Sequence, residues 1–255
     1  MTERPWHQFC AIAVMAKAPQ PGRAKTRLAP PLTADEAAVI CAAFLRDVTD
    51  NLARAAQEAP IVCYAAYAPA GSEALLAPHL APGTQLVLAD GSMPAPRRVQ
   101  GFGRSLLHAA TSLFAIGYGA VALLNSDSPT LPTALLCQAA TALLAPGDRV
   151  VLGPADDGGY YLIGMKAPHA HLFEDVSWST ESVADQTRAR ARALGLEFFE
   201  IDPWYDVDDS VALRRLVREV TTPARAANYA APFSAKVVAE LRLAERLADS
   251  VASCG

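Results

Sequence analysis

The sequence lacks the features of several common protein classes. Its five cysteines are scattered and show neither C-x-x-C nor His-x-x-His spacing, which excludes the usual zinc sites. We expect four of them to be small buried side chains, namely Cys10, Cys41, Cys63 and Cys137. No apolar run approaches the roughly 18 residues of a membrane span, and no leader-like segment opens the chain. We therefore expect a cytoplasmic protein without membrane insertion.

Charge is also scarce. Charged residues make up 19% of the 255 residues, hydrophobic residues 52%, and the formal net charge is -4. This balance gives no general attraction to nucleic acid, so we expect no such partner, and any phosphate site must be local. No G-x-S-x-G motif and no cysteine–histidine nucleophile pattern is present, which argues against a hydrolase.

Short apolar runs alternate with amphipathic stretches along most of the chain. Predicted strands cover residues 9–16, 61–67, 85–89, 120–124, 149–153, 160–165 and 197–201, and predicted helices cover 33–58, 101–116, 131–144, 180–194 and 210–220. This alternation predicts an α/β fold with a mostly parallel sheet and helices on both faces. We expect one domain over residues 1–220. Residues 221–255 then form a linker and an extension with one helix, 234–250, which packs back on the domain or forms a homodimer.

The loop after the first predicted strand is rich in cations. Residues 17–28, which we call the cationic loop, contain Lys17, Arg23, Lys25 and Arg27 among prolines, glycine and alanines. Ligands of open α/β sheets bind beyond the carboxyl ends of the strands, where this loop lies. We therefore predict that these four residues and Gly22 bind nucleotide phosphates, although the loop is neither a Walker loop nor G-x-G-x-x-G. The alternative is a solvated basic turn.

Two acidic groups follow later strands. Asp127 lies next to Ser126 in N-S-D-S-P-T, and Asp208 lies in D-V-D-D, residues 206–209. Mg²⁺ and Mn²⁺ take few carboxylates together with water and phosphate oxygens. The spacing therefore predicts a divalent cation held by Asp127 and Asp208, with Ser126 at the nucleotide. Helix N-capping explains Asp127 as well, and capping by Asp208 or Asp209 explains the second group.

A second candidate region lies between the fifth and sixth predicted strands. Residues 153–161, G-P-A-D-D-G-G-Y-Y, form what we call the acidic segment. Its glycines allow close approach of a ligand, and Asp156 or Asp157 is the candidate catalytic base. A plain hairpin turn explains the Asp157–Gly158 pair equally well. The predicted substrate-binding residues are Gly158, Gly159, Tyr160, Trp178, Ser179 and Thr180. A buried tryptophan and a Ser or Thr helix cap explain the last three as well.

These segments together resemble the bacterial GT-A-like glycosyltransferases described as radical-SAM- or selenodomain-associated, or arsenosugar-type, transferases. The resemblance rests on M-A-K-A-P-Q-P-G-R-A-K-T-R-L (15–28), S-D-S-P-T-L-P (126–132), G-P-A-D-D-G-G-Y-Y-L-I-G (153–164), W-S-T (178–180) and D-V-D (206–208). It implies a nucleotide-diphospho-sugar transferase fold, phosphates at the cationic loop, and an acceptor near the acidic segment. One stretch departs from the family pattern Gly-Asp-Leu-Gly-x-Arg-Met, because residues 100–106 read Q-G-F-G-R-S-L.

The resemblance implies a metal-dependent transferase that takes a sugar nucleotide and a small-molecule acceptor. An alternative is nucleotidyl transfer of a guanylyl or cytidylyl group to a phosphorylated or carboxylated substrate, because A-K-T-R-L-A-P (24–30) is similar to phospholactate guanylyltransferases. In that reaction Lys25 and Arg27 stabilise the departing pyrophosphate. The altered stretch at 100–106 motivates a third hypothesis, a degenerate protein that binds nucleotide without turnover.

Overall fold

A seven-stranded sheet forms the centre of the molecule. The structure is a computed structural model that describes residues 5–222 and 228–252. The strands are β1 (Cys10–Ala16), β2 (Ile61–Tyr67), β3 (Gln85–Leu88), β4 (Ala120–Leu124), β5 (Arg149–Pro154), β6 (Tyr160–Met165) and β7 (Glu197–Glu200). Their order is β3-β2-β1-β4-β6-β5-β7, and only β6 runs antiparallel to its neighbours. The predicted mostly parallel α/β sheet is confirmed.

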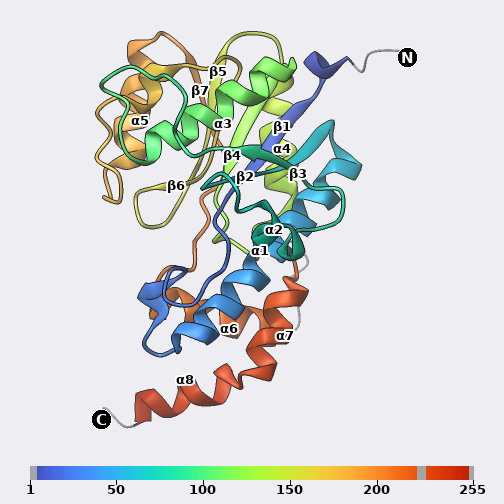
Figure 1. Cartoon of the computed structure of the whole chain (residues 1–255), viewed down its shortest axis with the longest axis vertical. Coiled ribbons are helices and arrows are strands. Elements are labelled where there is room, and N and C mark those ends of the chain that lie inside the picture. The colour runs from blue at the N-terminus through green and yellow to red at the C-terminus, as the bar shows by residue number, and fades with distance from the viewer. Residues whose placement is uncertain (1–4, 223–227, 253–255) are drawn as a thin grey trace.

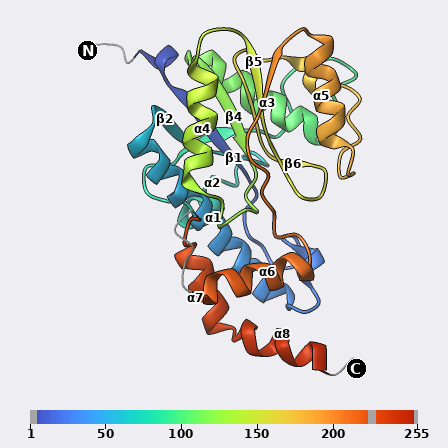
Figure 2. The ribbon, with the colours of Figure 1, turned by 180° about the vertical axis from the view of Figure 1, so that it is seen from behind.

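Helices cover both faces of this sheet. The longer ones are α1 (Ala34–Glu58), α3 (Phe102–Ile116), α4 (Thr133–Leu144) and α5 (Val183–Ala193), and the short ones are α2 (Glu73–Leu76), η1 (Trp6–Gln8), η2 (Thr26–Leu28), η3 (Ala77–His79) and η4 (Ala170–Phe173). Helices α3 and α5 lie on the face seen in Figure 1, and α4 lies on the face seen in Figure 2. Alternate residues of β1 face the two layers: Ile12 and Val14 pack with α1 and α4, and Ala11 and Ala13 with α3.

The start of α1 follows directly from the sequence. Thr33 Oγ1 accepts a hydrogen bond from Glu36 N, and Thr33 N donates one to Glu36 Oε2, so the two residues form a capping box. The helix predicted from residue 180 begins only at Val183, because residues 180–182 form a turn in which Val183 N donates to Thr180 O.

A third group of helices lies below the sheet. Helices α6 (Ser210–Thr221), α7 (Pro232–Glu240) and α8 (Leu243–Ala252) pack with the first half of α1 and with Leu28 of the cationic loop in a separate hydrophobic cluster (Figure 1). The single helix predicted for 234–250 is wrong, because Arg242 has a φ of 50° and divides it into α7 and α8.

The C-terminal helices are anchored on α1. Asp47, which is fully buried, accepts hydrogen bonds from the backbone N–H groups of Phe233 and Ser234 and so binds the first turn of α7. On α8, Arg246 pairs with Glu36 and donates to Pro31 O, which lies just after the cationic loop. These contacts connect the C-terminal helices to the segment that carries the predicted phosphate site.

Two further expectations concern burial. Cys10 and Cys41 are buried as predicted, whereas Cys63 and Cys137 are partly exposed, so that prediction was half right. Among residues 5–222 and 228–252, no helix combines the length and the apolar character needed to cross a bilayer.

Candidate active site

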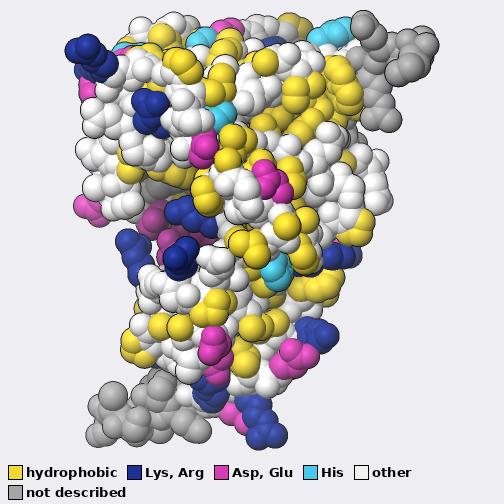
Figure 3. Space-filling view, viewed as in Figure 1, with side chains coloured by type: hydrophobic (Ala, Val, Ile, Leu, Met, Phe, Trp, Pro, Cys, Tyr) yellow, Lys and Arg dark blue, Asp and Glu magenta, His cyan; other side chains and the backbone are white. Residues whose placement is uncertain are grey.

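A pocket of about 700 Å³ opens where β1 and β4 end. These strands pair in parallel, Val14 opposite Leu124, so the residues that follow them emerge at the same edge of the sheet. Figure 3 shows cationic and acidic side chains gathered in a hollow between the sheet and the lower helices. The predicted site residues that line the pocket are Lys17, Arg23, Lys25, Arg27, Ser126, Asp127, Tyr160, Ser179 and Asp208.

Three cations of the pocket wall have no acidic partner. Lys17, Arg23 and Arg27 are exposed, and no carboxylate of the described residues lies within ion-pair distance of any of them. Arg23 donates a hydrogen bond to Gln20 Oε1 at 3.5 Å. Three unneutralised cations on one wall have the charge and the hydrogen-bond donors that suit a polyanion. Gly22, also predicted to bind nucleotide, is not among the residues that line the pocket.

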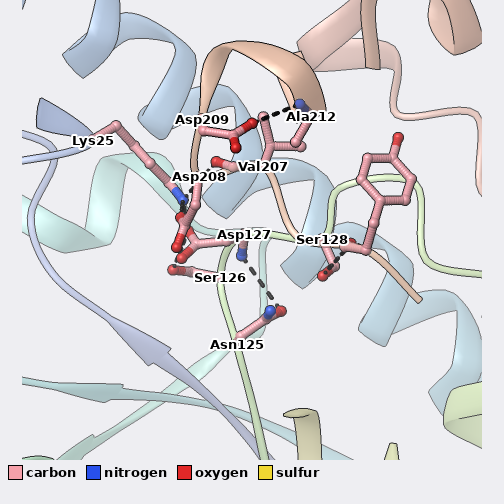
Figure 4. A network of polar contacts seen from close by, with 10 residues as sticks. Lys25, Asn125, Ser126, Asp127, Ser128, Val207, Asp208, Asp209 and Ala212 are labelled. Carbon is pink, nitrogen blue, oxygen red and sulfur yellow. Dashed lines mark hydrogen bonds and ion pairs between the residues drawn. The ribbon is translucent and has the colours of Figure 1, made fainter. Parts of the chain in front are cut away.

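Lys25, the fourth cation, is bound within the protein. Its ammonium donates to Val207 O at 2.8 Å and to Asp208 Oδ1 at 2.5 Å, and it lies 2.9 Å from Asp127 Oδ1 (Figure 4). Burial alone would lower its pKa, but the two carboxylates outweigh burial and raise the pKa above its usual value. Lys25 is therefore firmly charged and acts as the counterion of Asp127 and Asp208.

The two carboxylates come from loops that the fold brings together. Val207 N donates to Asp127 O at 2.8 Å, which joins the loop after β4 to the loop before α6. Ser126 Oγ donates to Asp127 Oδ1 at 3.0 Å. Asp127 does not cap α4, whose N-cap is Pro132, whereas Asp209 caps α6 through the N–H groups of residues 211 and 212. The capping alternative thus holds at Asp209, and Asp127 and Asp208 face the pocket.

Asp206 is a pocket residue outside the set predicted from the sequence. It is partly buried and lines the pocket beside Asp208. Burial first, and then the charges of Asp208, Asp157 and Asp127, raise its pKa to about 7. The D-V-D-D motif pointed to these aspartates. Which of the three enters the pocket depends on the turn before α6, which the sequence does not specify.

The acidic segment lies mostly outside the pocket. Asp156 pairs with Arg215 of α6 at 2.8 Å, and Asp157 accepts from Gly159 N at 2.9 Å in a tight turn between β5 and β6. Neither of these aspartates lines the pocket, and neither do Gly158 and Gly159, whereas Tyr160 does. The hairpin-turn alternative therefore describes the conformation of this segment.

Trp178 and Thr180 also lie outside the pocket wall. The Trp178 indole packs edge-to-face on Phe102 with ring centroids 5.6 Å apart, and its Nε1 donates to Gln100 O. Thr180 Oγ1 donates to Ser177 O. Both side chains support the local fold, and only Ser179 of this trio lines the pocket.

The stretch that departs from the family pattern does reach the pocket. Phe102 and Ser105 line it, and Phe102 is 47% exposed. Arg104 instead donates to Gly91 O and Met93 O, away from the pocket wall. This end of the pocket is therefore neutral and partly aromatic.

The predicted metal site has suitable ligand chemistry but is bridged by a lysine. Carboxylate oxygens suit Mg²⁺ or Mn²⁺, and Asp127 and Asp208 lie close enough to contact one cation. In this structure the cation between the two carboxylates is the Lys25 ammonium. Among the residues that the structure covers, no cluster of three or more His, Cys, Asp or Glu side chains is arranged to hold a metal. A divalent cation there would complete its shell with water and phosphate.

Comparison with known proteins agrees with this architecture. Residues 48–180 match a family described as "Uncharacterized protein conserved in bacteria (DUF2064)". A crystal structure of a "putative nucleotide-diphospho-sugar transferase" from Desulfovibrio desulfuricans G20 has 28% sequence identity and a TM-score of 0.76, covering 93% of this chain and 96% of that one. No curated protein matches the sequence.

Two further solved structures match with lower similarity. One is a CMP:2-keto-3-deoxy-manno-octonic acid synthetase complexed with CTP, with 10% identity, a TM-score of 0.48, and coverage of 82% of this chain and 96% of that one. The other is a 4-diphosphocytidyl-2C-methyl-D-erythritol synthase from Anaerococcus prevotii DSM 20548, with 8% identity, a TM-score of 0.46, and coverage of 81% and 95%.

Proposed function

We propose that this chain, a member of the DUF2064 family, is a transferase that uses a nucleotide-activated donor. Its pocket joins a cationic wall, formed by Lys17, Arg23 and Arg27, to a carboxylate wall, formed by Asp127, Asp206 and Asp208. The observation that carries the proposal is the trio Lys17, Arg23 and Arg27, which face the pocket without acidic partners. Unpaired cations in a pocket of this size suit a diphosphate with an attached group. The similarity to the Desulfovibrio protein supports the same class.

Glycosyl transfer is the reaction that we favour. A sugar nucleotide would place its diphosphate on the cationic loop, and an acceptor would attack the anomeric carbon from the side of Tyr160 and Ser179. As the bond from the sugar to the diphosphate breaks, Lys17, Arg23 and Arg27 would stabilise the charge that develops on the leaving nucleoside diphosphate. A divalent cation held by Asp127 and Asp208 would supply further positive charge.

Nucleotidyl transfer is the second candidate, and the same three cations favour it. A phosphate or carboxylate oxygen of the substrate would attack the α-phosphate of a nucleoside triphosphate, and pyrophosphate would leave. The pyrophosphate leaving group has both of its phosphates free and carries several negative charges. A wall with several unpaired cations suits such a leaving group well.

Thermal shift and product analysis distinguish these reactions. The protein is incubated with Mg²⁺ or Mn²⁺ and panels of nucleoside triphosphates and sugar nucleotides, and released nucleoside diphosphate and pyrophosphate are measured. We expect stabilisation by sugar nucleotides and release of nucleoside diphosphate once an acceptor is present. Pyrophosphate release with stabilisation only by triphosphates would establish nucleotidyl transfer instead. No response to any nucleotide would contradict both reactions.

Substitution of Asp127 tests the carboxylate wall. Asp127→Asn removes half of the negative charge that a metal would contact. The affinity for Mn²⁺ in the presence of a nucleotide, measured from thermal shifts, should therefore fall at least about 10-fold. The matched control is Asp185→Asn on α5, whose side chain is 80% exposed and pairs with Arg188. Unchanged metal dependence in Asp127→Asn would show that this residue does not hold the metal.

A further inference from the structure

Lys25 differs from the other cations of the loop because its ammonium is fully engaged. An ammonium has three N–H donors, and Lys25 has three protein acceptors, namely Val207 O, Asp208 Oδ1 and Asp127 Oδ1. Its side chain is only 7% exposed. In this arrangement Lys25 has no donor left for a phosphate, although it lines the pocket.

The backbone holds Lys25 in this position. Its φ of 50° is left-handed, and its carbonyl accepts from Leu28 N at 2.9 Å in the short η2 turn. Leu28 is fully buried in the lower hydrophobic cluster. The loop is therefore anchored beyond Lys25, so that the ammonium lies between the loop after β4 and the loop before α6 (Figure 4).

A divalent cation at Asp127 and Asp208 would need the same carboxylate oxygens that Lys25 now contacts. Two cations cannot share that position, because both require direct contact and their charges repel. We propose that Lys25 is an internal counterion that competes with the divalent cation for Asp127 and Asp208, and that metal binding releases its ammonium toward the phosphates. The inference rests on the proposed function in one respect, the metal site at these two carboxylates.

The competition couples metal and nucleotide. A metal that arrives alone must displace a charged, buried lysine from three acceptors, and the lysine gains no new partner. When a nucleotide is bound, its phosphates accept the released ammonium, so each ligand strengthens the binding of the other. The Lys25 ammonium meanwhile offsets part of the negative charge of Asp127 and Asp208.

Binding of Mn²⁺ alone tests the competition. Free Mn²⁺ is measured by electron paramagnetic resonance with the wild-type protein, Lys25→Met, and the control Lys236→Met, which removes an exposed lysine of α7 outside the pocket. We expect Lys25→Met to bind Mn²⁺ at least 10-fold more tightly than the wild type, and Lys236→Met to match the wild type. Equal or weaker binding by a folded Lys25→Met would overturn the competition.

A measurement on the wild-type protein keeps the test independent of the folding of the variant. The rate of Lys25 acetylation by acetic anhydride is followed by mass spectrometry of peptides, with and without saturating MnCl₂. Release predicts that Mn²⁺ increases the labelling of Lys25 several-fold and leaves Lys236 unchanged. Mn²⁺ binding with Lys25 still protected overturns the competition alone, whereas no Mn²⁺ binding by wild type or Lys25→Met overturns the metal site of the proposed function as well.

Discussion

The cationic loop and the acidic segment look alike in sequence but differ in what their charges contact. Both contain charged residues, proline and glycine, and both follow a strand. Lys17, Arg23 and Arg27 face the pocket without acidic partners, whereas Asp156 is paired with Arg215 and Asp157 caps its own turn. The comparison teaches that a charged loop indicates a ligand site when its charges have no partner in the protein.

Chain direction explains much of this difference. β5 and β6 are antiparallel neighbours, so the acidic segment must reverse the chain within a few residues and uses its polar groups for that turn. β1 is followed by a helix on one face of the sheet, and the connection to Ala34 is long enough to cross the edge and form one wall of the pocket.

Alanine at matched glycines should show the difference most strongly. Gly158 of the acidic segment has a φ of 87°, and a Cβ there would stand 2.1 Å from Glu181 O. Gly22 of the cationic loop has a φ of 71°, and a Cβ there would meet nothing within 4 Å. Gly22→Ala should cost about 1–2 kcal/mol for the left-handed conformation, and Gly158→Ala at least about 3 kcal/mol because the backbone must also move. Urea unfolding measures both, and equal losses would contradict the structure.

Removal of a charge should lower nucleotide affinity in the cationic loop but not in the acidic segment. Arg27→Met removes a charge-assisted hydrogen-bond donor of about 1.5–3 kcal/mol, so affinity for a nucleoside diphosphate with Mn²⁺ should fall about 10-fold or more. Asp156→Asn breaks an ion pair whose partners are both about half exposed, so it should change stability by under about 1 kcal/mol and leave affinity unchanged. Calorimetric titration of both variants decides the matter. A comparable loss of affinity in Asp156→Asn would place the acidic segment in the site after all.

Local patterns in the sequence were sufficient for most of the sheet. The strands at 61–67, 120–124 and 160–165 have the predicted bounds, because each is a short apolar run with polar or glycine-rich flanks. The capping box also fixed the start of α1. The C-terminal helices were harder to predict, because a left-handed Arg242 interrupts an amphipathic pattern that continues on both sides.

The candidate site was predictable in its location but not in its pairings. The carboxyl ends of β1 and β4 had to bring the cationic loop and Asp127 to one edge of the sheet. The engagement of Lys25 by Asp208 depends on residues 183 positions apart, and the pairing of Asp156 with Arg215 on residues 59 positions apart. No local pattern reports such contacts, so Lys25 and Asp156 were assigned from residue type and loop position without their partners.

The smallest expected effect is that of the Asp157 charge, in the acidic segment, on the Asp206 carboxyl in the pocket. Asp206 has an ordinary pKa of 3.8 and a folded-state pKa of about 7, raised first by burial and then by Asp208, Asp157 and Asp127, so metal-free protein should lose stability as pH rises from 5 to 8. Asp157→Asn keeps an acceptor for Gly159 N but removes one of these charges, so that loss should shrink, by at most about 1 kcal/mol. Urea unfolding with chelator at both pH values measures it. Asp185→Asn, whose charge does not act on Asp206, should lose as much stability between pH 5 and 8 as the wild type. An equal loss in Asp157→Asn would show that the acidic segment has no electrostatic effect on the pocket.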